Sequence, residues 1–422
     1  MIRRSLVVGV ACVALGAVII TAQTKSVPRP AALPPGQQPP GESAAPDGYA
    51  PIPQWLGQTR APVPAKSETF AVETFADGLN GAGSFHFLPA GRILVAERPG
   101  RLKIVGKDGK ISEPLEDMPK NMYLRGQALY EVQPDKNFST NRTIYMTYAI
   151  LPEGADPAKQ RSPGHLHVVS AKISADDKRL ENVKDLLDAE GVSGHVVQAN
   201  DGTLLVTSTV PAGLGVNSSE WMQPQQLDSL MGKILRINAD GSIPKDNPFV
   251  GKAGARPEIF ALGFRDEGGV AINPKTGRLW AAEHGPRGGD ELNEVEKGKN
   301  YGFPVISYGR DYTGKPINND KTAQAGMEQP VYFWTPDIAP AGIAFYSGTM
   351  FPGWNGNLFV SSLLGRYLVR LVLDGHNHVV AEERLLKDLN ARIRGVNEGP
   401  DGSLYVLTDG NDGKILRLVK KG

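Results

Sequence analysis

The stretch Gly277-Arg-Leu-Trp-Ala-Ala-Glu283 joins a turn residue to a short run dominated by apolar residues. The same unit recurs five more times, as Gly91-Arg-Ile-Leu-Val-Ala-Glu97, Asn141-Arg-Thr-Ile-Tyr-Met-Thr147, Gly202-Thr-Leu-Leu-Val-Thr-Ser208, Gly356-Asn-Leu-Phe-Val-Ser-Ser362 and Gly402-Ser-Leu-Tyr-Val-Leu-Thr408. Gly and Asn tolerate positive φ at a turn, and β-branched and aromatic residues suit a pleated, packed surface. Each copy therefore predicts a turn followed by a β-strand.

These units predict an all-β, six-bladed β-propeller. Several copies are followed by a second run of the same kind, such as Gly100-Arg-Leu-Lys-Ile-Val105 and Gly413-Lys-Ile-Leu-Arg-Leu418, which indicates hairpins. Six units at wide, irregular spacing suit six blades joined by long loops. Two unrelated β-sandwiches are the alternative, but the shared unit runs from one end of the body to the other. A ring of blades leaves a central channel, and the loops that converge on its end suit a small polar ligand.

The composition excludes several classes of function. The chain carries 46 Lys and Arg against 45 Asp and Glu, a formal net charge of +1. This balance argues against a dedicated nucleic-acid binder and against binding to an anionic membrane surface. The single cysteine, Cys12, lies in the N-terminal apolar run. The body of the protein is therefore expected to have no disulfide and no cysteine-ligated metal.

Three segments are expected along the chain. Residues 1–22 combine a basic start with an uncharged run and a small residue at its end, as in a signal peptide. An uncleaved membrane anchor is the alternative; cleavage would leave no stable membrane span. Both place the globular part outside the cytoplasm, in a periplasmic or secreted protein. Residues 23–66 predict a Pro-rich disordered linker, and residues 67–422 the propeller domain.

Long strings in the body carry a family resemblance. They are Glu283-His-Gly-Pro-Arg-Gly-Gly-Asp-Glu-Leu-Asn293, Asn300-Tyr-Gly-Phe-Pro-Val-Ile-Ser-Tyr-Gly309, Gly232-Lys-Ile-Leu-Arg-Ile-Asn238 and Leu94-Val-Ala-Glu-Arg-Pro-Gly-Arg101. With these strings the chain resembles the soluble glucose/sorbosone (aldose sugar) dehydrogenases that depend on pyrroloquinoline quinone (PQQ). The resemblance implies a six-bladed propeller with PQQ across the channel mouth and Ca²⁺ against the quinone. It further implies that a base takes the proton of the sugar's anomeric hydroxyl, that the hydride goes to PQQ, and that a lactone leaves.

The same resemblance assigns cofactor-binding residues. PQQ carries three carboxylates, and planar, permanently charged guanidinium groups are suited to bind them. Arg265 matches an arginine beside the cofactor, and Arg392 and Arg394 match a pair that contacts PQQ. His284 would face the cofactor, and Gln127 matches a glutamine near the substrate and the cofactor. Surface arginines or ion pairs between blades are the alternative for the arginines.

Gly285 and Pro286 match the turn whose backbone carbonyls bind calcium in the family. Calcium accepts carbonyl and carboxylate oxygens readily. Without the surrounding string, a structural turn would be the better interpretation of these two residues.

Two positions depart from the family pattern. The family's catalytic base is a histidine, but the corresponding position here is Gly191, and His195 stands where the family has arginine. His195 is the candidate catalytic base; four residues along a strand shift a side chain by roughly 13 Å, which requires a rebuilt loop. Asp266, a candidate cofactor-binding residue, stands where the family has an asparagine. An acid there would repel a PQQ carboxylate unless it were protonated or bound to a cation.

These observations predict an exported quinoprotein oxidoreductase that oxidises an aldose sugar, with PQQ and Ca²⁺ as cofactors. A quinone or a cytochrome would accept the electrons. The alternative is a catalytically degenerate propeller that acts as an extracytoplasmic binding protein, which Gly191 and Asp266 favour. A hydrolase with a channel metal would need several converging carboxylates or histidines, and the sequence supplies no convincing set.

Overall fold

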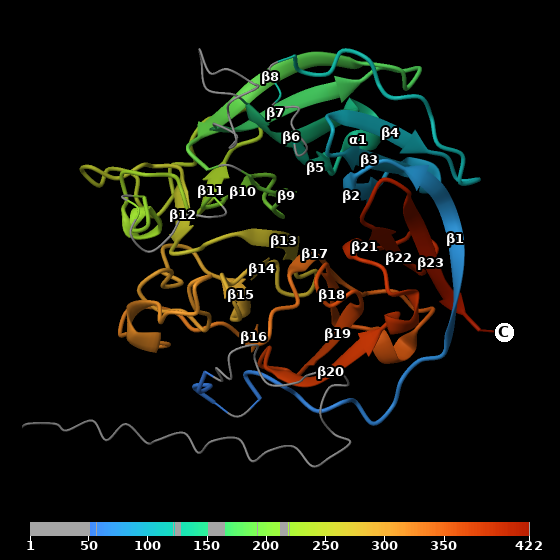
Figure 1. Ribbon diagram of the computed structural model, residues 1–422. Helices are drawn as coiled ribbons and strands as arrows, with labels where there is room; N and C mark the ends of the chain where they lie inside the picture. The colour runs from blue at the N-terminus through green and yellow to red at the C-terminus, as the bar shows by residue number, and fades with distance from the viewer. Residues whose placement is uncertain are drawn as a thin grey trace, which may run out of the picture.

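A computed structural model describes residues 51–55, 57–120, 122, 128–150, 165–191, 193–211, 218 and 220–421. These residues form six antiparallel sheets arranged as blades around a central channel, so the prediction of a six-bladed propeller is confirmed (Figure 1). Blade 1 has three strands and each of the other blades has four.

The blades follow one another along the chain. Blade 1 consists of β2 (Ala82–Phe87), β3 (Ile93–Glu97) and β4 (Arg101–Val105), and blade 2 of β5 (Leu129–Pro134), β6 (Thr143–Ile150), β7 (His165–Ile173) and β8 (Leu180–Ala189). Blade 3 consists of β9 (Val196–Gln198), β10 (Leu204–Ser208), β11 (Lys233–Ile237) and β12 (Ile259–Leu262), and blade 4 of β13 (Glu267–Ile272), β14 (Leu279–Glu283), β15 (Asp290–Val295) and β16 (Tyr332–Trp334). Blade 5 consists of β17 (Pro340–Phe345), β18 (Leu358–Ser362), β19 (Leu368–Leu373) and β20 (Val379–Leu385). Blade 6 consists of β21 (Ile393–Glu398), β22 (Leu404–Thr408), β23 (Gly413–Lys420) and β1 (Phe70–Leu79), and the one short α-helix described, α1 (Phe138–Asn141), precedes β6.

Each copy of the repeated sequence unit forms the second strand of a different blade. These strands are β3, β6, β10, β14, β18 and β22. Every residue of β3, β10, β14, β18 and β22 is buried, because a second strand lies inside its sheet and both of its faces meet neighbouring blades. This explains why the units read as continuous apolar runs rather than alternating patterns.

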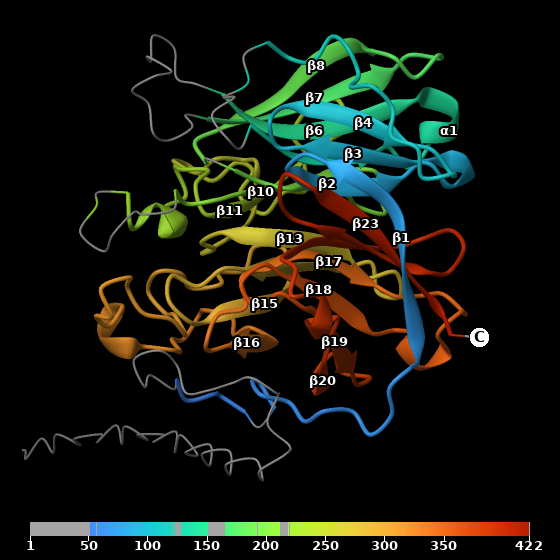
Figure 2. The ribbon, with the colours of Figure 1, turned by 45° about the vertical axis from the view of Figure 1, so that its right-hand side comes forward.

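The ring is closed by its first and last strands. β1 pairs antiparallel with β23, from Phe70 opposite Lys420 to Leu79 opposite Gly413, and the two lie side by side in both views (Figures 1 and 2). Hydrophobic contacts between blades form the core; for example, Trp280 of blade 4 packs edge-to-face on Phe345 of blade 5, with ring centroids 5.6 Å apart.

The first strands of the blades surround the channel (Figure 1). Gly268 of β13 lies against the carbonyl of Pro340, and Gly269 lies against that of Ala341, so β13 and β17 run in the same direction. A Cβ added at Gly268 would lie only 2.0 Å from the Pro340 oxygen, which shows how closely these strands approach. Gly342 of β17 also lies close to Gly395 and the Arg394 carbonyl of β21. The channel end at which these strands begin is called the upper rim, and the opposite end the lower rim.

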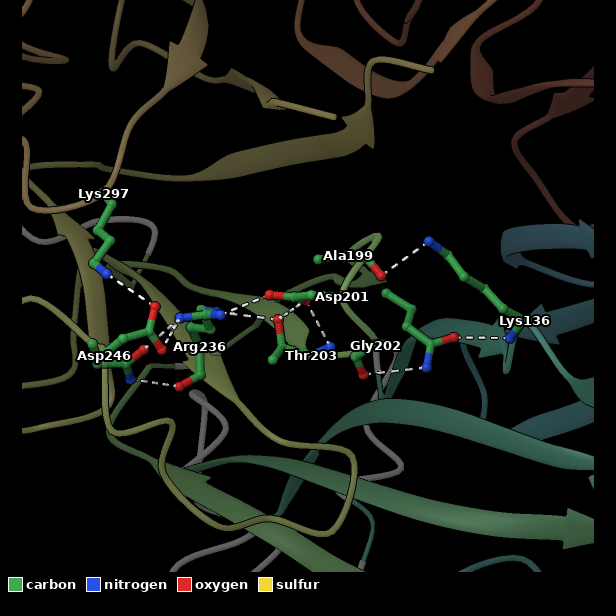
Figure 3. A network of polar contacts seen from close by, with 10 residues as sticks. Lys136, Ala199, Asp201, Gly202, Thr203, Arg236, Asp246 and Lys297 are labelled. Carbon is green, nitrogen blue, oxygen red and sulfur yellow. Dashed lines mark hydrogen bonds and ion pairs between the residues drawn. The ribbon is translucent and has the colours of Figure 1, made fainter. Parts of the chain in front are cut away.

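Polar contacts join blades 2, 3 and 4 near the lower rim (Figure 3). Lys136, which follows β5, donates from Nζ to the Ala199 carbonyl at 2.9 Å. Asp246 accepts hydrogen bonds from Arg236 of β11 at 2.8 Å and from Lys297, which follows β15, at 3.0 Å. Exposed ion pairs each contribute about 0–1 kcal/mol, so this network fixes the relative placement of the blades more than it adds stability.

The segment before β1 differs from the expected disordered linker. Within residues 51–66, the Gln58 side chain is buried and donates to the Pro330 carbonyl at 2.9 Å, and Phe333 N–H donates to the Gln58 carbonyl at 2.9 Å. Ala61 N–H donates to the Tyr332 hydroxyl at 2.8 Å. These hydrogen bonds to blade 4 offset the cost of ordering the segment, and composition alone does not reveal them.

Residues 1–50 lie outside the described part of the chain. They comprise the whole expected signal peptide and residues 23–50 of the expected linker. Among the described residues, no helix has the length and apolar character that crossing a membrane requires.

Candidate active site

Three arginines converge on one carboxylate at the upper rim. Arg98, in the turn between β3 and β4, donates to Asp409 at 2.6 Å. Arg392, which directly precedes β21, and Arg394 within that strand donate to the same carboxylate at 2.9 and 3.1 Å. Asp409 directly follows β22. Blades 1 and 6 therefore bring together two sequence-predicted arginines and one, Arg98, that the sequence analysis did not single out.

This arginine cluster has an excess of positive charge. Burial alone would raise the pKa of Asp409, but hydrogen bonds and charge from Arg394, then Arg392 and Arg98, outweigh it and hold the pKa at about 2. Asp409 is therefore ionised and offsets only one of the three guanidinium charges. The Arg392 side chain is 44% exposed. The cluster can accept a planar polyanion through charge-assisted hydrogen bonds.

Arg265 lies at the same rim, directly before the Asp266 that leads into β13. Its Nη1 donates to the His284 carbonyl at 3.1 Å and reaches the Gly285 carbonyl at 3.4 Å. Its Nη2 donates to the Tyr312 hydroxyl at 2.9 Å, and the Tyr312 ring lies 5.8 Å from the guanidinium. Tyr312 is 55% exposed and thus forms part of the rim surface, although its sequence context gave no sign of this.

Asp266 is paired with a positively charged side chain. Its negative charge is therefore balanced, and the expected repulsion of a PQQ carboxylate is reduced. Its Oδ2 lies 3.4 Å from Nδ1 of His284, whose Nε2 lies 2.7 Å from the Pro340 carbonyl. Burial alone would lower the pKa of His284, but the hydrogen bond and charge of Asp266 outweigh it and raise the pKa to about 9. His284 is therefore protonated at neutral pH and donates from both nitrogens. A histidine in this state cannot serve as a base.

The Asp266–His284 pair predicts a pH dependence of stability. The pKa of His284 rises from 6.5 to about 9 on folding, so the folded state holds one more proton between these values. The stabilisation is complete below pH 6.5 and is lost as the pH rises through 9, with a slope of at most about 1.4 kcal/mol per pH unit. Urea unfolding of the wild type and of His284→Gln at pH 6 to 10 measures this difference. The exposed His378→Gln is the control, and parallel pH profiles for wild type and His284→Gln would refute the assignment.

The Gly285–Pro286 turn is tied down by a buried acid. Asp290 accepts hydrogen bonds from the Gly285 N–H at 2.8 Å and from Ile338 and Ala339 N–H at 2.7 Å each. Burial, and then the charge of neighbouring Asp337, raises the pKa of Asp290 well above its usual range. No set of three His, Cys, Asp or Glu among the described residues could hold a metal ion by itself. A cation at this turn would therefore depend on backbone carbonyls and on a bound partner.

The family's base position is closed by its surroundings. A Cβ added at Gly191 would lie 2.1 Å from the Ser208 hydroxyl oxygen and 3.0 Å from the backbone of Thr209. Ser193, two residues on, is bonded to Thr209 by a side-chain hydrogen bond of 2.5 Å. The end of β10 thus occupies the space of a side chain at position 191. A catalytic side chain at this position is therefore excluded in this arrangement.

This close contact gives a stability prediction. Gly191→Ala is expected to lower the free energy of unfolding by about 1–3 kcal/mol, because the new methyl group overlaps Ser208. Gly375→Ala is the matched control, since a Cβ there meets nothing within 4 Å. Urea unfolding of both variants checks the difference; equal stabilities would show that position 191 has room for a side chain.

His195 lies in the channel wall as part of a hydrogen-bonded set. It directly precedes β9, and its Nδ1 lies 3.0 Å from Oε2 of Glu131 on β5. The other oxygen of Glu131 lies 3.1 Å from Nε2 of His86 on β2. The chain near His195 keeps its strand pairing, since Thr207 N–H donates to the His195 carbonyl at 2.9 Å. Sequence reasoning missed Glu131 and His86, because nothing in their local patterns shows which strands face each other across the channel.

A cavity of about 420 Å³ lies within the channel. It is lined by all six inner strands and includes His195, Glu131 and Arg394. The candidate base thus shares a cavity with one of the rim arginines. Gln127 lies outside the described residues, so its expected place near the substrate stays a prediction.

Comparison with known proteins identifies the family of this propeller. The family model for "Glucose / Sorbosone dehydrogenase" matches residues 79–417. The chain belongs to the glucose/sorbosone dehydrogenase family. This glucose/sorbosone dehydrogenase homologue is 35% identical to the aldose sugar dehydrogenase YliI of Escherichia coli over 357 residues, which cover 84% of this chain and 94% of that protein. It is 26% identical to quinoprotein glucose dehydrogenase B of Acinetobacter calcoaceticus over 441 residues, covering 84% and 90%.

A solved structure described as a glucose dehydrogenase is 40% identical to this chain and superimposes with a TM-score of 0.76, covering 83% of this chain and all of the other. The family membership and the propeller fold are thereby shown, and the family's activity is sugar oxidation by dehydrogenation.

Proposed function

We propose that this family member is a PQQ-dependent aldose dehydrogenase that oxidises the anomeric carbon of a sugar to a lactone. The observation that carries the proposal is the meeting of Arg98, Arg392 and Arg394 at the rim of the cavity that also contains His195. The relative from Acinetobacter calcoaceticus, named a quinoprotein, supports a quinone cofactor.

The residues present at the upper rim fit PQQ. Three guanidinium groups with one carboxylate leave two positive charges unmatched, which suits a guest with three carboxylates. Arg392 and Arg394 would bind these carboxylates together with Arg98, and Arg265 would border the ring system. Asp266 and His284 would support the site as a neutralised pair. When bound, PQQ supplies the acceptor for the hydride that leaves the anomeric carbon.

Calcium would bind at the carbonyls of Gly285 and Pro286. Asp290 holds the Gly285 N–H, which fixes this turn at the rim. Arg265 reaches the Gly285 carbonyl only at 3.4 Å, and a carbonyl oxygen has a second lone pair for a cation. Because no group of three acidic or histidine ligands surrounds the described part of the turn, the remaining ligands would come from the cofactor and water.

His195 would act as the general base. Its Nδ1 is engaged by Glu131, which leaves Nε2 for the proton of the anomeric hydroxyl. This arrangement replaces the histidine that position 191 lacks.

The alternative is a propeller that binds its ligand without oxidising it. Gly191 favours this alternative, since the family's base position cannot hold a side chain here. His195, whose Nδ1 is hydrogen-bonded to the Glu131 carboxylate, favours the enzymatic function. The N-terminal sequence supports export to the periplasm or the exterior, where a quinone or cytochrome would take up the electrons.

Reconstitution tests the proposal. The purified protein is mixed with PQQ and Ca²⁺, and dye reduction is followed with a panel of aldoses while the product is identified by NMR. Turnover with lactone formation is expected. Binding of PQQ without turnover would refute the enzymatic function and favour the binding protein. Absence of PQQ binding would refute both the proposed cofactor and the proposed mechanism.

A further inference from the structure

We propose that Glu131 is the positioning residue that makes His195 a base, and that His86 fixes Glu131 in this role. The proposal deepens the proposed function and rests on it. It assigns the three residues to one catalytic unit in the channel wall, built from the inner strands of blades 1 and 2 and from the residue before the inner strand of blade 3.

The geometry shows a carboxylate shared by two imidazoles. Glu131 uses Oε2 for His195 Nδ1 at 3.0 Å and Oε1 for His86 Nε2 at 3.1 Å. Oε1 also accepts the N–H of Val132 at 3.0 Å. The Glu131 side chain is 10% exposed, whereas those of His195 and His86 are 20% and 25% exposed. A buried carboxylate thus holds two partly exposed imidazoles that line the same cavity.

The charge state of Glu131 suits this role. Burial alone would raise its pKa, but hydrogen bonds from His195 and then His86 outweigh burial and hold the pKa below its usual range. An ionised Glu131 only accepts hydrogen bonds, so each histidine must donate from the nitrogen that faces it. In its neutral form, His195 then carries its proton on Nδ1, and Nε2 is the nitrogen without a proton.

Other charged groups around the unit do not replace Glu131. Asp266 influences His195 through its charge, but its own close partner is His284. Arg394, which lines the same cavity, is bonded to Asp409. The cavity also contains Lys136 and Glu398, which lie at the lower-rim ends of their strands.

The proton transfer balances with these residues alone. The O–H bond of the anomeric hydroxyl breaks and an N–H bond forms at His195 Nε2. Bound PQQ would supply the two-electron acceptor for the hydride of the anomeric C–H bond, which leaves the carbon as the lactone carbonyl. The resulting imidazolium is stabilised by ionised Glu131, which keeps its hydrogen bond from Nδ1 throughout. The proton is later released from Nε2 to water in the cavity. A carboxylate that orients a histidine by its second nitrogen fixes both the tautomer and the ring.

The first test reads the tautomer of His195 without any cofactor. Long-range ¹H–¹⁵N spectra of the folded protein distinguish histidines protonated at Nδ1 from those protonated at Nε2, and His195→Gln identifies the signal. The proposal expects the Nδ1–H form in the wild type and its loss in Glu131→Gln. An Nε2–H form in the wild type would overturn the proposal, whether or not the protein oxidises sugars.

The second test reads catalysis in the PQQ-loaded protein. Glu131→Gln is expected to lower kcat about 100-fold, and His86→Gln about 10-fold, with the KM for the aldose and the Kd for PQQ changed less than threefold. Glu398→Gln, which removes a charge from the same cavity, should keep the wild-type kcat. Wild-type kcat in Glu131→Gln would overturn the role of Glu131 and leave the proposed function intact. An inactive wild type would instead refute the proposed function.

Discussion

His195→Gln is expected to lower kcat for aldose oxidation by about 10²–10⁴-fold, the contribution that a general base makes to proton transfer. His195 lines the channel cavity, and its Nδ1 is engaged by Glu131 at 3.0 Å, so Nε2 is the nitrogen proposed to take the substrate proton. Glutamine can keep a hydrogen bond to Glu131 but cannot accept the proton. PQQ affinity should stay near the wild-type value, since the rim arginines are unchanged.

The measurement is steady-state dye reduction together with PQQ binding by calorimetry. His165→Gln is the control, since this histidine is half exposed on blade 2 and pairs only with Asp188 in the contacts described. An unchanged kcat in His195→Gln would show that another group takes the proton. A lost PQQ affinity would show that His195 contacts the cofactor itself.

Arg394→Ala is expected to weaken PQQ binding about 10- to 100-fold. A hydrogen bond to a charged group contributes about 1.5–3 kcal/mol, and each 1.4 kcal/mol changes an equilibrium tenfold. The side chain is 18% exposed and bonds Asp409 at 3.1 Å, so a carboxylate of PQQ would meet it in a partly desolvated site. The variant also removes one of the two unmatched positive charges.

Calorimetric titration of PQQ into the wild type, Arg394→Ala and Arg417→Ala measures this effect. Arg417 is the control because it forms a surface ion pair with Glu73 on blade 6, away from the channel. Rising salt should weaken PQQ binding to the wild type more than to Arg394→Ala, since fewer charges are screened in the variant. Equal affinities in all three proteins would place PQQ elsewhere.

The fold could be predicted from sequence because a single local pattern repeats. A turn residue followed by a buried run marks the second strand of every blade, from β3 to β22. The segment that contains Gln58 shows the limit of such reasoning. Its composition predicts disorder, but its hydrogen-bond partners lie between the strands of blade 4, 250 and 272 residues away along the chain.

The site was predictable only in part, for a similar reason. Arg265, Arg392 and Arg394 match arginines of the family, and the structure places all three at the upper rim. Arg98 and Glu131 could not be assigned, since their roles depend on partners in other blades. The expected repulsion between Asp266 and a PQQ carboxylate also depended on a partner that the sequence does not show, because His284 supplies the neutralising charge.

The most direct test is a crystal structure of the protein with PQQ and Ca²⁺. The account predicts one PQQ at the upper rim, with its carboxylates on Arg98, Arg392 and Arg394. It also predicts that His195 Nε2 faces the space beside the quinone. PQQ bound at another place, or density absent from the rim at saturating PQQ, would contradict it.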